Sequence, residues 1–217
     1  MNFPRLVFLK EFLNTFHTTG AIAPSGRWLA RKMVEPLLGM SGPRRVLEAG
    51  PGTGVFSHYL IQELRPGDEF TLCEINPVFA EFLRNRLNEN PTWREKQSQV
   101  RVVCTDIRDL FLPSHYDFIV SGLPLNNFSP DFVHELLLGF VESLKPQGVH
   151  TYFEYQAVRD FRRRWGSPET RNRLEGVQEA IDSLREKAWV SRKSVILNLP
   201  PAYAYEIRPH TVSKPMP

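Results

Sequence analysis

The chain has 217 residues, of which 41% are hydrophobic and 24% are charged, with a formal net charge of +3. This usage excludes a disordered or collagen-like chain, and the length suits one domain with a substantial core. The mild positive charge gives no reason to expect a nucleic-acid partner. Cys73 and Cys104 both fall in predicted strands. This favours structural thiols in a reducing cytoplasm over a disulfide scaffold or a metal site.

No apolar segment approaches the length of about 18–20 residues that a membrane-spanning helix needs. Leu6–Leu9 resembles the beginning of a signal-peptide core, but Lys10 and Glu11 interrupt it and no small-residue cleavage site follows. We therefore expect the N-terminus to belong to the mature protein.

The predicted elements begin with two helices. Apolar residues at helical spacing predict a helix over residues 3–16, and Ser25 is a candidate N-cap for a second helix that ends near Leu38. Strands and helices then alternate. We expect strands at 45–49, 69–74, 100–104, 116–121 and 149–155, and helices at 55–64, 77–87 and 130–144. This alternation predicts a parallel, doubly wound sheet.

The last part of the chain breaks this rhythm. Residues 158–187 are polar and are expected to be helical, and two extended runs follow at 189–199 and 202–208. Pro200-Pro201 joins them, and so short a connection permits only an antiparallel pair. The sequence therefore predicts an α/β fold with a mostly parallel, seven-stranded sheet that ends in a C-terminal antiparallel hairpin.

The first predicted strand ends in a glycine-rich turn, Glu48-Ala49-Gly50-Pro51-Gly52-Thr53-Gly54. Glycines let the backbone turn sharply and approach a ligand closely, and the next helix presents free N–H groups. A dinucleotide-binding fold would show G-x-G-x-x-G instead. An acid stands two residues before the first glycine. A carboxylate at this position either attracts a cationic ligand or orders the loop, and it suits a pyrophosphate less well.

Two further acids follow the next two strands. Glu74 can accept hydrogen bonds from both hydroxyls of a ribose, and Asp106 can accept one from an adenine amine, although Asp is also a common turn residue. The turn Ser121-Gly122-Leu123-Pro124 follows the fourth strand. Since the carboxyl ends of parallel strands line one crevice, we expect a ligand to bind there.

These features occur in an order that resembles the class I S-adenosylmethionine-dependent methyltransferases over residues 44–155. The resemblance implies a Rossmann-like fold, S-adenosylmethionine as the cofactor and no metal. It also implies a set of cofactor-binding residues: Ser25, Glu48, Gly50, Gly52, Thr53, Gly54, Glu74, Ile75, Asp106, Ile107, Ser121 and Gly122.

Three segments, Thr19–Ser25, Ser121–Pro124 and Asn198–Ala202, narrow the resemblance further. They look like the bacterial phospholipid N-methyltransferases, which convert phosphatidylethanolamine stepwise toward phosphatidylcholine, and like the similar enzymes that methylate ornithine lipids. The resemblance then implies a single methyltransferase domain over residues 1–217. Residues 1–40 would form an N-terminal helical segment that faces the membrane and the substrate, and residues 41–217 the Rossmann-like core.

The same resemblance implies a cytoplasmic enzyme that is peripheral on the inner face of the cell membrane and acts on a membrane aminolipid. The predicted helix over residues 3–16 is rich in aromatic residues and carries Arg5 and Lys10, which suits an anionic membrane surface. The basic and aromatic cluster Arg159–Trp165 is a second candidate for this contact. The alternative for the first is packing on the core or on another subunit, and the alternative for the second is a solvated helix face.

Candidate catalytic residues stand at the end of the fifth predicted strand. Tyr152 and Tyr155 could accept a hydrogen bond from the substrate ammonium or stack on it, and Glu154 could attract it or take its proton. Because alternate residues of a strand face opposite sides of the sheet, Glu154 and Tyr155 are not expected to act together.

Two other functions compete with lipid methylation. An rRNA adenine N6-dimethyltransferase shares the core, but such enzymes usually carry Asn/Asp-Pro-Pro-aromatic where this chain has Ser121–Pro124. A membrane-associated binding module with a relict cofactor site is the non-enzymatic alternative. The intact glycine turn with Glu48, Glu74 and Asp106 argues against it.

Overall fold

A computed structural model describes residues 24–156 and 167–210. The predicted helix over residues 3–16 and the cluster Arg159–Trp165 lie outside the described residues. Among the helices that are described, none combines the length and the apolar character that a bilayer crossing requires.

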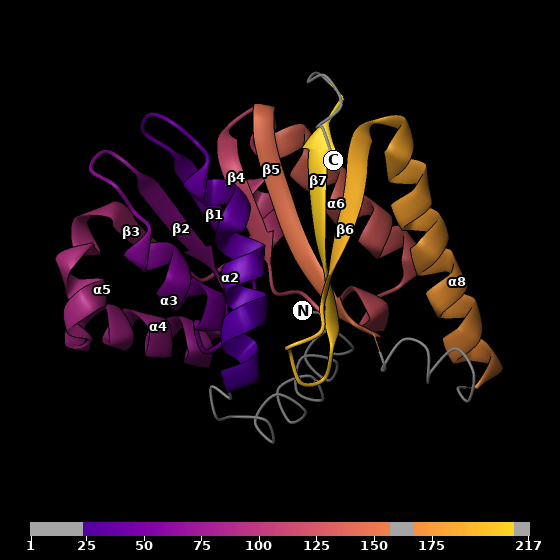
Figure 1. Cartoon of the computed structure of the whole chain (residues 1–217), viewed down its shortest axis with the longest axis horizontal. Coiled ribbons are helices and arrows are strands. Elements are labelled where there is room, and N and C mark those ends of the chain that lie inside the picture. Colours follow the sequence, from indigo (N-terminus) through magenta and orange to yellow (C-terminus); the bar gives the residue numbers. More distant parts are fainter. Residues whose placement is uncertain (1–23, 157–166, 211–217) are drawn as a thin grey trace.

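The sheet has seven strands in the order β3-β2-β1-β4-β5-β7-β6. Strands β1 to β5 pair in parallel, and β7 pairs antiparallel with both β5 and β6, as expected from the sequence. Figure 1 shows this twisted sheet with β3 and β6 at its two edges. The strands are β1 (Arg45–Ala49), β2 (Glu69–Cys73), β3 (Val100–Val103), β4 (Tyr116–Ser121), β5 (Leu144–Tyr155), β6 (Ala188–Val195) and β7 (Ala202–Pro209).

Helices cover both faces of the sheet, and each face has its own apolar core. One core joins the sheet to α2, α3, α4 and α5, and the other joins it to α6 and α8. Figure 1 shows α2 and α3 in front of the sheet and α6 behind it. The helices are α2 (Pro24–Leu38), α3 (Val55–Gln62), α4 (Pro77–Glu89), α5 (Pro91–Glu95), α6 (Pro130–Ser143) and α8 (Pro168–Ser183). Short 3-10 turns occur at Gln97–Gln99, Ile107–Leu110, Leu125–Asn127 and Leu184–Glu186.

Helix starts in this chain follow a repeated local rule. Asn76, Ser129 and Ser167 each accept a hydrogen bond from a backbone N–H of the first helical turn, and each is followed by proline. A polar cap satisfies a free N–H, and proline at the first helical position sets the backbone angle without losing a hydrogen bond. Helix α2 is described from Pro24, the first described residue, and Ser25 lies in its first turn, so the capping role of Ser25 stays a prediction.

Two strand boundaries and one short helix also differ from the sequence prediction. Strand β5 begins at Leu144, the last residue of the predicted helix, because Leu144 pairs with Tyr116 of β4. The pairing then shifts register and resumes between Val149 and Phe118. Strand β6 ends at Val195, so the hairpin turn is Ile196–Pro201 and not only the two prolines. The five-residue helix α5 was not expected, because so short a segment shows no helical periodicity.

A buried ion pair stabilises the end of the sheet at which the parallel strands β1 and β2 begin. The Arg44 side chain bonds both carboxylate oxygens of Asp68 and also donates to the carbonyl oxygens of Leu37 (2.9 Å) and Glu63 (2.7 Å). Both side chains are almost fully buried. Because a buried charge is tolerated only when it is paired and hydrogen-bonded, this cluster fixes the end of α2 and the β1 and β2 starts together.

Candidate active site

The candidate site lies at the opposite end of the parallel strands, where β1 and β4 end side by side. The strand order reverses direction between these two strands, and open α/β sheets bind ligands outside such a switch point. The turn after β4 closes tightly on the turn after β1. Gly122 donates its N–H to the carbonyl oxygen of Ala49 (2.9 Å), and a Cβ on Gly122 would lie 2.7 Å from the Gly50 carbonyl oxygen. The buried Ser121 hydroxyl accepts a hydrogen bond from the Leu123 N–H (3.3 Å) and fixes the second turn.

The glycine turn after β1 leaves open space at its centre. Gly52 has a φ of +55°, which is the left-handed region that side chains disfavour, and a Cβ placed there would meet no atom within 4 Å. Its neighbour Gly50 also has a positive φ, but a Cβ there would lie 2.6 Å from Leu123. Gly50 is therefore required by packing between the two turns, whereas Gly52 borders a space that a ligand can approach.

Glu48 lies beneath this turn on β1 and is completely buried. Neither of its carboxylate oxygens has a hydrogen-bond partner of good geometry among the described residues. Burial raises the pKa of Glu48 to about 8, and the nearby Ser57 hydroxyl and N–H offset only part of that effect. A buried carboxyl group with unused acceptors is costly for the fold, so its presence indicates a role toward a cationic ligand.

Glu74 lies at the end of β2 and holds the centre of the glycine turn. One carboxylate oxygen accepts from the Gly52 N–H (3.0 Å), and the other accepts from the Asn76 N–H (2.9 Å). Burial raises the pKa of Glu74, and the backbone N–H groups of Asn76, Gly52 and Ile75 oppose that rise. Each oxygen keeps a second lone pair, so both hydroxyls of a ribose can still be accepted.

Asp106 lies beyond the end of β3 and is paired with Arg108. The Arg108 guanidinium contacts both Asp106 carboxylate oxygens, with N–O distances of 3.0 and 2.6 Å, and this contact raises the pKa of Arg108. An adenine amine would therefore share Asp106 with a guanidinium. Ile75 and Ile107 follow the two strand ends, with Ile75 half-exposed and Ile107 buried, so an apolar surface adjoins the two acids.

The support beneath the glycine turn was not predicted from the sequence. Arg86 of α4 donates to the carbonyl oxygen of Thr53 (2.8 Å), and its guanidinium lies 4.7 Å from the centre of the Trp93 ring. Trp93 of α5 is fully buried, and it would lie 2.9 Å from a Cβ on Gly54. The only sequence signal for this support is the capping pair Asn90-Pro91 before Trp93.

The three candidate catalytic residues separate between the two faces of the sheet. Tyr152 is fully buried and stacks on Tyr205 of β7, with ring centres 4.5 Å apart. Glu154 lies on the same face and accepts a hydrogen bond from the Tyr205 hydroxyl (3.0 Å). Tyr155 lies on the other face, beside Phe153, and burial raises its pKa. The full burial of Tyr152 favours a packing role over contact with a substrate.

The remaining candidate, Ser25, comes from another element. It lies in the first turn of α2, whose helix runs beside β5 and β7. The other candidates for cofactor binding come together at the ends of β1, β2, β3 and β4. Together they offer acceptors for a cationic group and for two hydroxyls, beside an apolar surface. This set of acceptors fits S-adenosylmethionine, because the sulfonium and ammonium groups of that cofactor are cationic and its nucleoside carries two ribose hydroxyls.

Comparisons with known proteins agree with this geometry. Residues 46–148 match the family model described as "Methyltransferase domain". The ornithine lipid N-methyltransferase of Singulisphaera acidiphila is 28% identical over 143 residues, which cover 66% of this chain and 73% of that protein. The tRNA1(Val) (adenine(37)-N6)-methyltransferase of Tolumonas auensis is 32% identical, over 38% of this chain and 33% of that protein.

The fold is also that of solved methyltransferases. The O-methyltransferase from Bacillus cereus, solved in complex with S-adenosylhomocysteine, has a TM-score of 0.65 with 13% identity, covering 93% of this chain and 90% of that one. At this identity the likeness concerns the fold alone. The chain therefore has the Rossmann-like fold of class I methyltransferases, and its matched residues 46–148 form a methyltransferase domain whose cofactor is S-adenosylmethionine.

Proposed function

We propose that this enzyme transfers methyl groups to the primary amine of a membrane aminolipid, either ornithine lipid or phosphatidylethanolamine. The observation that carries the proposal is the 28% identity to an ornithine lipid N-methyltransferase over 66% of the chain. That match extends beyond the part of the chain that the general methyltransferase model covers, residues 46–148. The similarity is therefore not limited to the glycine turn and its cofactor site, which methyltransferases of many substrates share.

The reaction is an in-line displacement. When bound, S-adenosylmethionine would supply its methyl group to the amine nitrogen as the carbon–sulfur bond breaks, with the electron pair staying on sulfur and the new ammonium losing a proton. The amine must be neutral to attack, and for an amine with a pKa of about 10 deprotonation at pH 7 costs about 4 kcal/mol.

The chain's own residues contribute mainly by positioning. The glycine turn and Glu74 hold the cofactor, and a fixed approach of the two reactants supplies much of the rate. Among the three candidates on β5, Glu154 is the acid that could attract the lipid ammonium, and its carboxylate is oriented by the Tyr205 hydroxyl. Tyr155, on the opposite face, could stack on the ammonium. Proton loss from the product needs only a water or carboxylate near the nitrogen.

The proposed function is tested by the lipids of a heterologous bacterial host that makes phosphatidylethanolamine and is supplied with ornithine lipid synthesis. Expression of this chain should produce lipid species heavier by one, two or three methylene units, read by mass spectrometry for each lipid class separately. A Glu74→Ala variant expressed at the same level is the control for cofactor-dependent methylation. Unchanged masses in both lipid classes, with the purified protein binding S-adenosylmethionine, would contradict an aminolipid substrate.

The match to a tRNA adenine N6-methyltransferase keeps nucleic-acid methylation as a second candidate. It covers only 38% of this chain, and the turn after β4 reads Ser121-Gly122-Leu123-Pro124 rather than the Pro-Pro-aromatic form that base-methylating enzymes usually carry. Transfer of a labelled methyl group to purified tRNA or rRNA, with no transfer to lipid, would favour this candidate.

A further inference from the structure

The turn between β6 and β7 has its polar and apolar residues in the reverse of the usual arrangement. Ile196, Leu197 and Leu199 are 76%, 67% and 82% exposed, whereas Asn198 between them is buried. Asn198 is held inward by its own bonds, since its side-chain amide donates to the Pro200 carbonyl oxygen (2.7 Å). Single exposed leucines are ordinary on protein surfaces, but three large aliphatic side chains held outward within four residues form a patch that indicates an interaction site.

This turn lies at the same edge of the sheet as the candidate active site. Tyr155, the last residue of β5, pairs with Ala202, the first residue of β7, so residues 196–201 extend beyond the end of β5. Gln156 connects the two, because its N–H donates to the Pro201 carbonyl oxygen (2.9 Å) and its side chain contacts Ser194 (2.7 Å). The turn is therefore fixed relative to the strand that carries Glu154.

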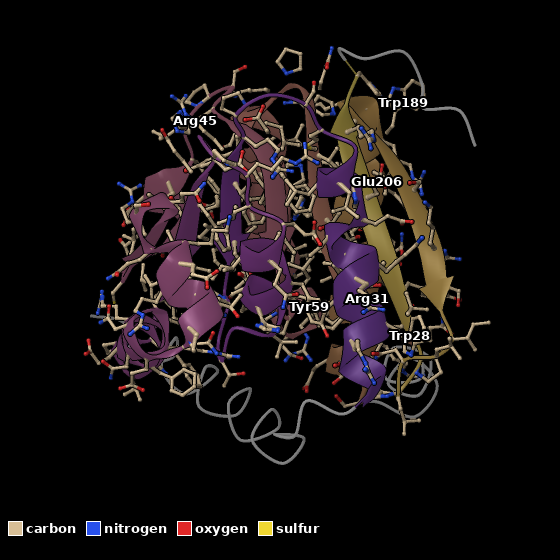
Figure 2. All side chains as sticks on the ribbon, turned by 60° about the vertical axis from the view of Figure 1, so that its left-hand side comes forward. Trp28, Arg31, Arg45, Tyr59, Trp189 and Glu206 are labelled. Atoms are coloured by element: carbon tan, nitrogen blue, oxygen red, sulfur yellow. The ribbon has the colours of Figure 1, made fainter. Side chains whose placement is uncertain are left out.

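Basic residues and a tryptophan accompany the exposed turn. Arg192 and Lys193 are exposed on β6, and Lys193 lies three residues, about 10 Å, before Ile196. Trp28 on the neighbouring helix α2 is 46% exposed. Figure 2 shows Trp28 toward the end of α2 that is near the β6–β7 turn, with Arg31 next along the helix, whereas Trp189 and Glu206 mark the opposite end of the hairpin.

Basic residues outnumber acidic ones around the patch. The sequence has no Asp or Glu between Lys187 and Glu206, nor between Pro24 and Glu35. Glu35 itself is shared between Lys32 (2.5 Å) and Lys193 (3.9 Å). Aliphatic residues at a tip, a tryptophan behind them and basic side chains around them are the chemistry that suits an anionic bilayer surface.

We propose that the β6–β7 turn, through Ile196, Leu197 and Leu199, inserts into the anionic face of a lipid bilayer and holds the active-site edge against it. This inference deepens the proposed function, since it states how an enzyme acting on a lipid headgroup reaches its substrate. A second copy of the chain suits the patch less well. A stable interface needs about 800 Å² from each partner, more than three side chains supply, and two basic surfaces would face each other.

The first experiment places an environment-sensitive fluorophore on the turn. Leu197→Cys and, as the matched control, Leu38→Cys at the other end of α2 are labelled in a Cys104→Ser background, because Cys104 is exposed and Cys73 is buried. With vesicles of phosphatidylcholine and phosphatidylglycerol, the probe at position 197 should shift its emission to shorter wavelength, and the probe at position 38 should not. The shift should weaken from about 0.1 M to about 1 M salt, as the Debye length falls from about 10 Å to about 3 Å.

The second experiment measures binding by vesicle sedimentation. Leu197→Ser/Leu199→Ser should lower the vesicle partition coefficient at least tenfold, and Leu38→Ser/Leu112→Ser, which also replaces two exposed leucines, should change it less than twofold. Both variants should keep the thermal midpoint of the parent protein. A lower midpoint for the turn variant alone would mean that the turn packs on the chain itself and would overturn the proposal.

Other outcomes would also overturn it. A protein that sediments with anionic vesicles equally well with and without the two serines contacts them elsewhere, and a concentration-dependent emission shift without vesicles means that a second copy covers the turn. Methylation of aminolipid dispersed in detergent micelles separates this inference from the proposed function. If the turn variant methylates micellar lipid normally but fails on vesicles, both hold. If the parent protein inserts its turn but methylates no lipid, only the proposed substrate is wrong.

Discussion

Glu48 should couple cofactor binding to the loss of a proton. In the free protein its carboxyl group is completely buried with no well-formed hydrogen bond among the described residues, and its pKa is raised to about 8. At pH 6 to 7 the group is therefore protonated. A cationic cofactor near it favours the carboxylate, because an opposite charge stabilises the charged form. Binding should then lower the pKa of Glu48 and release a proton.

The size of the effect follows from the pKa. If the complex keeps Glu48 ionised down to pH 6, the association constant for S-adenosylmethionine should rise about fiftyfold between pH 6 and pH 8, since the ionised fraction of the free protein rises by that factor. Isothermal titration calorimetry at pH 6.5 in buffers of different ionisation enthalpy should show release of close to one proton. Glu48→Gln is the matched control, because the cofactor's own α-amine titrates equally in both proteins.

Stability should depend on the same group with a defined sign. The raised pKa means that the contribution of Glu48 to folding is fully present below pH 4.5 and is lost as the pH rises toward about 8. Over that range the loss is on the order of 5 kcal/mol. The stability advantage of Glu48→Gln over the parent protein should therefore grow from pH 5 to pH 8. Proton release that is equal in both proteins, or a constant stability difference, would refute the assigned role of Glu48.

Three further substitutions test the site and the fold separately. Glu74→Ala should weaken S-adenosylmethionine binding at least tenfold in calorimetric titration, because each lost charged hydrogen bond contributes about 1.5–3 kcal/mol. The variant should keep a cooperative unfolding transition. An unchanged dissociation constant would remove Glu74 from the site. Gly52→Val should weaken binding more than Glu74→Ala does, since it adds a side chain at a φ of +55° where the ligand is expected to approach, and equal affinity to the parent would place the cofactor elsewhere. Asp68→Asn should lower the free energy of unfolding by about 3–5 kcal/mol in urea denaturation by leaving the buried Arg44 charge poorly paired, while the folded fraction still binds the cofactor normally.

The part of the fold that sequence predicts well is the part with strong local signals. Alternating apolar runs and helical periodicity between residues 44 and 155 predict the parallel strands, and the proline-containing turn near residue 200 predicts the antiparallel end of the sheet. The acids Glu48, Glu74 and Asp106 could be assigned to one edge because each follows or ends a parallel strand. Topology alone brings such positions together.

What could not be predicted depends on contacts between distant residues. The Arg44–Asp68 pair joins positions 24 residues apart, and neither residue shows a pattern that distinguishes it from a surface charge. Tyr152 and Tyr155 look equivalent in the sequence, but only the antiparallel pairing of β5 with β7 shows that Tyr152 is covered by Tyr205. The exposed turn after Val195 reads as the continuation of a strand, since Ile196, Leu197 and Leu199 are residues that a buried strand would also use.

The buried acids at the two ends of the parallel strands have different environments, and this difference distinguishes an acid that stabilises the fold from one placed for ligand binding. At the edge where β1 and β2 begin, the Asp68 carboxylate is fully bonded by Arg44 and by backbone N–H groups, and its pKa is lowered, although its burial acts in the opposite direction. At the end where these strands finish, the buried Glu48 has no basic partner among the described residues, and burial raises its pKa although Ser57 opposes that rise. A protein selected only for stability would gain by making the second edge apolar or by pairing its acid. We therefore expect the cost of the ionised Glu48 in the free protein to be recovered as affinity when a cationic cofactor binds beside it.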